Sequence, residues 1–174
     1  HTHSENIALY TDGARLEAVY DINEERAKEI AERYGARTTG SAEELIEDPD
    51  IDAVVIASWD GTHADLAIKC IHAGKPVFCE KPLATTLKDA EAVVKAEKEC
   101  GKRLIQVGFM RRFDPDYIKM KKIIDSGELG APLMAHCISR TRSHPKNHTT
   151  EQHITNIAIH EIDICRYLFG EDIC

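Results

Sequence analysis

The chain has 174 residues, of which 43% are hydrophobic, and its formal net charge is −8 at pH 7. This length can hold one domain and part of another, and the hydrophobic share is sufficient for a packed core. Without a basic face the sequence lacks the usual footprint of a nucleic-acid-binding protein. The longest apolar run, residues 53–57, is far too short to cross a bilayer, so we expect no membrane partner.

The six cysteines are scattered along the chain without a CxxC pair. Such spacing is typical of small apolar residues in a reducing compartment, and it argues against a disulfide or zinc framework. We therefore expect a cytoplasmic protein. His144, His148 and His153 could suggest a metal site, but they lie in a loop without an acidic neighbour in helical register. We expect no metal.

Helices and strands alternate over most of the chain. Residues 1–10 have the pattern of a helix with no strand before it, and the chain stops just past another helix, so we expect an internal fragment of a longer protein. Capping residues or glycines bound predicted helices at 24–34, 41–47, 62–73, 87–100 and from 114 onward. Predicted strands lie at 16–21, 51–57, 75–79 and 104–109, and the run 51–57 suits a strand buried on both faces. This alternation predicts an α/β fold with a doubly wound parallel sheet of the Rossmann type.

The pattern changes around Gly127. Residues 132–140 alternate like a half-exposed strand, which suits a mixed or antiparallel sheet. A polar loop at 141–152 then leads to a predicted helix at about 154–169. We place the boundary near residues 112–130, with a dinucleotide-binding domain at 1–120 and the beginning of a second domain at 121–174.

Polar residues follow several of the predicted strands, and in an open α/β sheet the loops at the carboxyl ends of strands line the ligand crevice. Asp21 could bond the ribose of NAD and repel the 2′-phosphate of NADP, although strand-end aspartates are also common turn formers. The glycine-rich fingerprint expected about 20 residues upstream is not in this sequence. Within the segment 58–63, Ser58, Trp59 and His63 are further candidates for cofactor contacts. Trp59 could stack on a flat ligand or simply cover the edge of the sheet.

Glu80-Lys81-Pro82 follows another predicted strand. A lysine in a closed site beside a nicotinamide cofactor can take part in proton transfer with an alcohol. Pro82 can form a cis peptide bond at little cost and so fix the direction of the lysine. An ordinary surface lysine is the alternative.

The predicted helix at 154–169 carries one polar stripe on a broad apolar surface. Asn156, His160, Asp163 and Tyr167 follow one another at spacings of four, three and four. A histidine on this stripe could take the proton from a hydroxyl as hydride leaves the same carbon. The alternative is the solvent-facing side of an amphipathic helix. Arg111, after the last predicted strand, is another candidate for the site or else a surface charge.

Taken together, these segments resemble the Gfo/Idh/MocA family, which includes glucose–fructose oxidoreductase and inositol 2-dehydrogenase, over nearly the whole chain. Residues 78–84, FCEKPLA, look like the E-K-P motif of the family, and residues 160–163, HEID, look like its H-E-x-D motif. Residues 106–114, QVGFMRRFD, are similar to the stretch that joins the two domains in inositol 2-dehydrogenases. Ser58-Trp59 and residues 132–134 also fit that branch.

The resemblance implies a Rossmann domain followed by an α/β domain whose open sheet assembles homodimers or homotetramers. It also implies NAD as the cofactor, and it assigns the following roles: Lys81 and His160 as the catalytic pair, Glu80 near the nicotinamide ribose, Asp21 on the adenosine ribose, and Arg111 and Asp163 near the substrate. The sequence departs from the family at Asn156, where inositol dehydrogenases usually carry an aspartate. An amide can still orient an imidazole, but it lacks the charge that stabilises imidazolium.

We therefore expect NAD-dependent oxidation of a secondary hydroxyl of a cyclic polyol or sugar, with the hydride passing to the nicotinamide and the proton to His160 with help from Lys81. The alternatives are a keto-sugar reductase of the same family and a non-catalytic NAD-binding sensor. In the strand order 3-2-1-4-5-6 the first strand is central, so we expect the 174-residue chain alone to bind the cofactor poorly or to fold badly.

Overall fold

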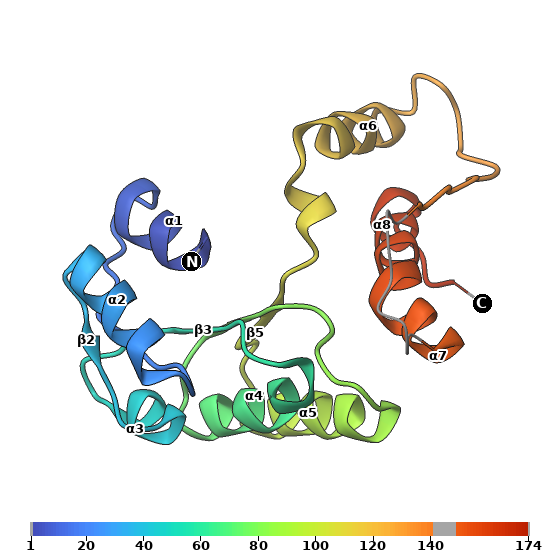
Figure 1. Ribbon diagram of the computed structural model, residues 1–174. Coiled ribbons are helices and arrows are strands. Elements are labelled where there is room, and N and C mark those ends of the chain that lie inside the picture. The colour runs from blue at the N-terminus through green and yellow to red at the C-terminus, as the bar shows by residue number, and fades with distance from the viewer. Residues whose placement is uncertain (1, 141–148, 174) are drawn as a thin grey trace. The chain divides into compact units, whose positions relative to one another are not determined.

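The computed structural model describes residues 2–140 and 149–173. The chain forms two compact units, His1–Val107 and Gly108–Cys174 (Figure 1). The helices of unit 1 are α1 (Thr2–Tyr10), α2 (Glu24–Tyr34), α3 (Ala42–Glu47), η1 (Asp60–Thr62), α4 (His63–His72) and α5 (Leu87–Cys100). Its strands are β1 (Ala18–Val19), β2 (Arg37–Thr38), β3 (Val54–Ile56), β4 (Val77–Cys79) and β5 (Ile105–Val107). The helical segments of unit 2 are η2 (Met110–Phe113), α6 (Pro115–Ser126), α7 (Thr150–His153), a π-helical turn (Ile154–Ala158) and α8 (Ile159–Phe169).

The strands of unit 1 are parallel, which confirms the predicted α/β architecture, but they form two sheets. β1 pairs with β2, and β3 pairs with β4, which pairs with β5. Among the described residues no strand lies between β1 and β3, the place that the order 3-2-1-4-5-6 gives to the first strand. The strands are also shorter than predicted, and the short β2 was not predicted.

The core of unit 1 lies on one face of the larger sheet. α4 packs against β3 and β4, and α5 packs against α4. Val54 and Ile56 are buried on this face, whereas Val55 on the other face is 38% exposed. The prediction that this strand is buried on both faces is therefore wrong, because α4 and α5 cover one face only.

Two of the cysteines belong to this core. Cys70 and Cys79 are fully buried, as expected of small apolar residues. Burial raises the pKa of the Cys79 thiol to about 12 and that of Cys70 to about 11, so both remain protonated at neutral pH. Cys137 and Cys165 are free thiols whose sulfur atoms lie 3.6 Å apart.

Local capping was predicted correctly at several helix ends. The side chains of Asn23, Ser41, Thr86 and Asp114 accept hydrogen bonds from backbone N–H groups of the first turns of α2, α3, α5 and α6. Caps of this kind each stabilise a helix by about 1 kcal/mol. These four helices therefore begin where their sequences predict.

Within unit 2, an ion pair joins η2 to α8. Arg112 Nε lies 3.1 and 2.9 Å from the two carboxylate oxygens of Asp163, and its Nη2 lies 2.6 Å from Oδ1. These bonds raise the pKa of Arg112 above its usual value. The same guanidinium lies 5.5 Å from the centre of the Tyr167 ring, one turn further along α8. Because the Asp163 side chain is only 6% exposed, its charge depends on Arg112 for compensation.

Two predictions for unit 2 are wrong. Residues 132–140 form no strand, and Leu133, Met134 and Ile138 are exposed. A strand needs a neighbouring strand for its backbone hydrogen bonds, and the described part of unit 2 contains no strand. The helix predicted from about Ile154 begins earlier, at Thr150, and contains the π-helical turn. Most of the predicted polar loop, residues 141–148, lies outside the described residues.

We expect Arg112→Ala to lower the free energy of unfolding by roughly 2 kcal/mol, because the substitution leaves the Asp163 carboxylate buried and unpaired. The value is below that of a fully buried pair, since the Arg112 side chain is 36% exposed. Urea denaturation followed by circular dichroism measures the change. The matched control is Arg166→Ala, which removes the exposed pair with Asp172 and should cost less than about 0.5 kcal/mol. Equal losses in the two variants would show that the Arg112–Asp163 pair has no special structural role.

Candidate functional site

The carboxyl ends of β3 and β4 bring two of the predicted segments together. β3 and β4 are parallel neighbours, with Val54 opposite Val77 and Ile56 opposite Cys79. Ser58–His63 follows β3, and Glu80–Pro82 follows β4, so both segments leave the sheet at the same edge. Loops at this edge are where open α/β folds bind their ligands. Asp21 follows β1 in the other sheet of unit 1.

The Asp21 carboxylate is engaged in the turn that leads into α2. Its Oδ1 accepts a hydrogen bond from the backbone N–H of Asn23 at 2.8 Å, and its Oδ2 lies 3.6 Å from Nη1 of Arg26. The side chain therefore acts as a turn former, which was the alternative interpretation, and it is still partly exposed beyond the strand. Its predicted bond to a ribose stays a prediction.

Trp59 stands out from the surface in the loop after β3. Its side chain is 77% exposed, so it does not cover the edge of the sheet. The indole ring lies directly on Gly61, where any Cβ atom would overlap it. The hydroxyl of Thr62 donates to the Trp59 carbonyl at 2.7 Å and contacts the Ser58 hydroxyl at 2.6 Å. This short loop thus presents an exposed flat ring on a constrained backbone.

His63 is buried, with 1% of its surface exposed, and both ring nitrogens face backbone carbonyls. Nδ1 lies 2.7 Å from the oxygen of Pro82, and Nε2 lies 3.1 Å from the oxygen of Ser58. The imidazole therefore connects the loop after β3 to the loop after β4. It faces the protein, and its predicted contact with a cofactor stays a prediction.

Glu80 and Lys81 lie in the loop after β4. The Lys81–Pro82 peptide bond is cis, as predicted. Glu80 Oε1 lies 2.7 Å from Nε2 of His3 in α1, and the His3 ring lies 5.5 Å from that of Phe78. Sequence reasoning missed His3, and no local signal could have found it, because 77 positions separate it from Glu80.

The candidates of unit 2 gather on and near α8. His160 is half-buried in the first turn of α8, and Asn156 lies in the π-helical turn before it. The predicted polar stripe assumed α-helical spacing, which a π-helical turn changes because its hydrogen bonds span five residues. Such turns are frequent at functional sites. Lys81 and His160, the predicted catalytic pair, belong to different units.

The two predicted substrate contacts in unit 2 already have ion-pair partners. Asp163 binds Arg112, and Arg111 Nη2 lies 2.7 Å from Oε1 of Glu161. Among the described residues, the second oxygen of Glu161 is buried without a hydrogen-bond partner, so it can still accept a bond from a further donor. Any contact between Arg111 or Asp163 and a substrate stays a prediction.

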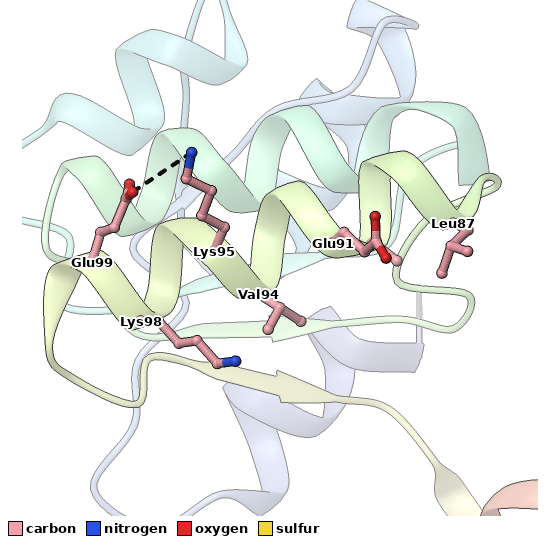
Figure 2. Close-up of a pocket in the computed structure, with 7 residues that line it drawn as sticks. Leu87, Glu91, Val94, Lys95, Lys98 and Glu99 are labelled. Atoms are coloured by element: carbon pink, nitrogen blue, oxygen red, sulfur yellow. Dashed lines mark ion pairs between the residues drawn. The ribbon is translucent and has the colours of Figure 1, made fainter.

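A shallow hollow lies elsewhere, along the surface of α5 (Figure 2). Its lining residues all come from that helix: Leu87, Ala90, Glu91, Val94, Lys95, Lys98 and Glu99. None of the predicted site residues is among them. Among the residues that the structure describes, no group of histidines, cysteines and acids could hold a metal ion, with the predicted candidates His144 and His148 lying outside that part. Within the same residues, no helix is long and apolar enough to span a membrane.

Comparison with known proteins identifies relatives over nearly the whole chain. The chain is 45% identical over 172 residues to inositol 2-dehydrogenase from Burkholderia lata and 46% identical over 172 residues to inositol 2-dehydrogenase 2 from Saccharopolyspora erythraea. In both cases the match covers 98% of this chain and 51% of the relative. The chain thus spans about half the length of the curated relatives that it matches.

Solved structures give the same result. The structure is similar to myo-inositol dehydrogenase from Lactobacillus casei in complex with NAD(H) and myo-inositol, with a TM-score of 0.84 and 35% identity over 97% of this chain and 50% of that one. It is also similar to a putative myo-inositol dehydrogenase from Sinorhizobium meliloti, with a TM-score of 0.81 and 31% identity over 98% of this chain and 52% of that one.

Two family models cover most of the sequence. The model described as "Oxidoreductase family, NAD-binding Rossmann fold" matches residues 1–109, and the Gfo/Idh/MocA C-terminal domain matches residues 117–173. The parallel α/β unit, the cis peptide bond in Glu80-Lys81-Pro82 and the exposed loop after β3 fit these matches. This chain belongs to the Gfo/Idh/MocA family of oxidoreductases.

Proposed function

We propose that the protein that carries this sequence oxidises a secondary hydroxyl of a cyclic polyol, an inositol, with NAD as the hydride acceptor. The observation that carries the proposal is the position of Lys81. It follows β4 at the carboxyl edge of a parallel sheet, beside the loop with Trp59, in a chain of this oxidoreductase family. The names of the relatives support an inositol as the substrate.

The residues of unit 1 fit a dinucleotide. The partly exposed carboxylate of Asp21 can accept hydrogen bonds from ribose hydroxyls, and the exposed Trp59 ring can stack on a flat part of the ligand. The Ser58 hydroxyl and the Glu80 carboxylate offer further polar contacts at the same edge of the larger sheet. When bound, NAD accepts the hydride from the substrate carbon. The negative charge of Asp21 disfavours the 2′-phosphate of NADP.

The chain's own task is to move the hydroxyl proton. We assign this proton to His160, with Lys81 assisting, because histidine and lysine side chains are among the groups that act as general acids and bases in enzymes. Asn156 would orient the imidazole through its amide. Arg111 and Asp163 stay candidates for polyol contacts, and either would then share its charge between an ion-pair partner and the substrate.

Other predictions go with this function. We propose a homodimer or homotetramer, which the family resemblance suggests. Two further expectations stay predictions. One is the cytoplasmic location inferred from the cysteines, and the other is the division of the chain into residues 1–120 and 121–174.

The first test is NADH formation by the natural full-length protein, offered NAD or NADP with a panel of inositols and aldoses. We expect turnover with NAD and at least one inositol, because the acid at Asp21 favours NAD and the relatives named above are inositol dehydrogenases. Reduction of a keto-sugar without the reverse oxidation would support the reductase alternative. Cofactor binding without turnover on any substrate would support the sensor alternative.

We expect Lys81→Ala in the full-length protein to lower kcat by about 100-fold or more, because general acid–base groups contribute that much. The dissociation constant of NAD should change little, since the proposed cofactor contacts stay in place. Lys88→Ala is the matched control, because Lys88 is exposed in the first turn of α5. Stopped-flow absorbance at the NADH band gives kcat, and calorimetry gives the affinity. A kcat equal to that of the Lys88 variant would remove Lys81 from the mechanism.

We expect Trp59→Ala to weaken NAD binding by about 2- to 10-fold, the loss of one aromatic stacking contact. Gly61→Ala should also weaken binding, because its methyl group would displace the indole ring. Leu87→Ala, which removes an exposed apolar side chain elsewhere on unit 1, is the control. Titration calorimetry measures all three affinities. Unchanged affinity in the Trp59 variant would show that the ring does not contact the cofactor.

A further inference from the structure

His63 lies between two loops of the proposed site and contacts both through its ring. Nδ1 faces the Pro82 carbonyl at 2.7 Å and Nε2 faces the Ser58 carbonyl at 3.1 Å. Carbonyl oxygens only accept hydrogen bonds, so any hydrogen on either ring nitrogen points at one of these two loops. A planar five-membered ring is rigid, so its place between the two carbonyls limits how closely the two loops can approach each other.

The ring is itself anchored on a rigid element. His63 is the first residue of α4, and the next turns of that helix bury Ala67, Cys70 and Ile71 in the core of unit 1. Such packing fixes the backbone from which the imidazole projects, and a side chain held in this way can position others to within a fraction of an ångström. The imidazole is thus a fixed reference for both loops.

Lys81 immediately precedes the residue whose carbonyl His63 contacts. On its other side, the Glu80 carboxylate contacts His3 of α1 at 2.7 Å. The two neighbours of Lys81 are therefore each held by a histidine from a different helix. The His63 contact is the buried one of the two, and it acts on the backbone, whereas His3 acts on a side chain.

We propose that His63 is a positioning residue for Lys81: it ties the loop after β4 to the loop after β3 and so fixes the direction of the lysine side chain. This role rests on the catalytic function proposed for Lys81. It also differs from the cofactor contact expected from the sequence, because the buried imidazole faces backbone carbonyls.

The test uses His63→Phe and His63→Gln in the full-length protein, with His72→Gln as the control because His72 is exposed on the same helix. Phenylalanine keeps the flat ring without hydrogen bonds, whereas glutamine keeps one amide donor for one of the carbonyls. We expect kcat to fall by about 10- to 100-fold in His63→Phe, since a small misplacement of a reacting group has effects of that size. The fall should be smaller in His63→Gln, KM for NAD should stay nearly constant in both, and the control should match the wild type.

A second readout does not depend on turnover. The ε-amino group of Lys81 should react faster with acetic anhydride in His63→Phe, relative to Lys88 in the same sample, as peptide mass spectrometry can show. If the wild type turns over no polyol but this ratio still changes, the proposed function fails and the positioning role stands. If the acetylation of Lys81 relative to Lys88 in the folded variants equals that in the wild type, the positioning role is overturned, whatever happens to kcat. If neither variant folds, His63 is a core residue and the proposal is also overturned.

Discussion

In a parallel sheet each strand exchanges its backbone hydrogen bonds with neighbours that run in the same direction, so the residues after every strand emerge at one edge. The pairing of β3 with β4 is the clearest case in this protein. Ile56 lies opposite Cys79, and two residues further the chain reaches Ser58 on one strand and Lys81 on the other. The backbone register brings these two loops to the same edge of the sheet. Their side chains then determine which ligand or reaction this edge could support.

Burial on one face of that sheet then determines which side chains can be rigid. α4 covers Val54 and Ile56 and buries its own apolar residues there, so its first residue, His63, is fixed against the loops. Trp59, four residues earlier, is exposed. Its ring lies against Gly61, where a side chain would displace it. The same short segment therefore holds one residue suited to positioning and one suited to contact with a ligand. His63 and Trp59 are both large residues in the segment after β3, so the difference between them comes from their burial.

The parts of the fold that depend on neighbouring residues could be predicted from the sequence, and the parts that depend on distant ones could not. Helix caps such as Asn23 and Thr86 act within three residues, and the alternation of helix and strand extends over short windows. The contacts of His63 with Pro82, Arg112 with Asp163 and His3 with Glu80 span 19, 51 and 77 positions. The prediction of a strand at 132–140 was wrong for a related reason. The residue pattern suits a strand, but the described residues of unit 2 offer no second strand to pair with it. Motif resemblance pointed to Lys81 and His160 as candidates, but it gave no indication of which side chains contact the segments that carry them.

The candidate site residues are divided between the two units. The residues proposed to contact NAD lie in unit 1, whereas His160 and Asn156 lie in unit 2. Within unit 2, the bond between Arg112 and Asp163 ties α8 to η2 one turn beyond His160. Within unit 1, His63 contacts the loop that carries Lys81. The proposed proton transfer uses Lys81 and His160, and in each unit a side-chain contact holds the loop or helix that carries one of them. Because the His63 contacts act on the loop that carries Lys81, we expect a change at His63 to act on kcat, whereas the affinity for NAD should follow Trp59 and Asp21.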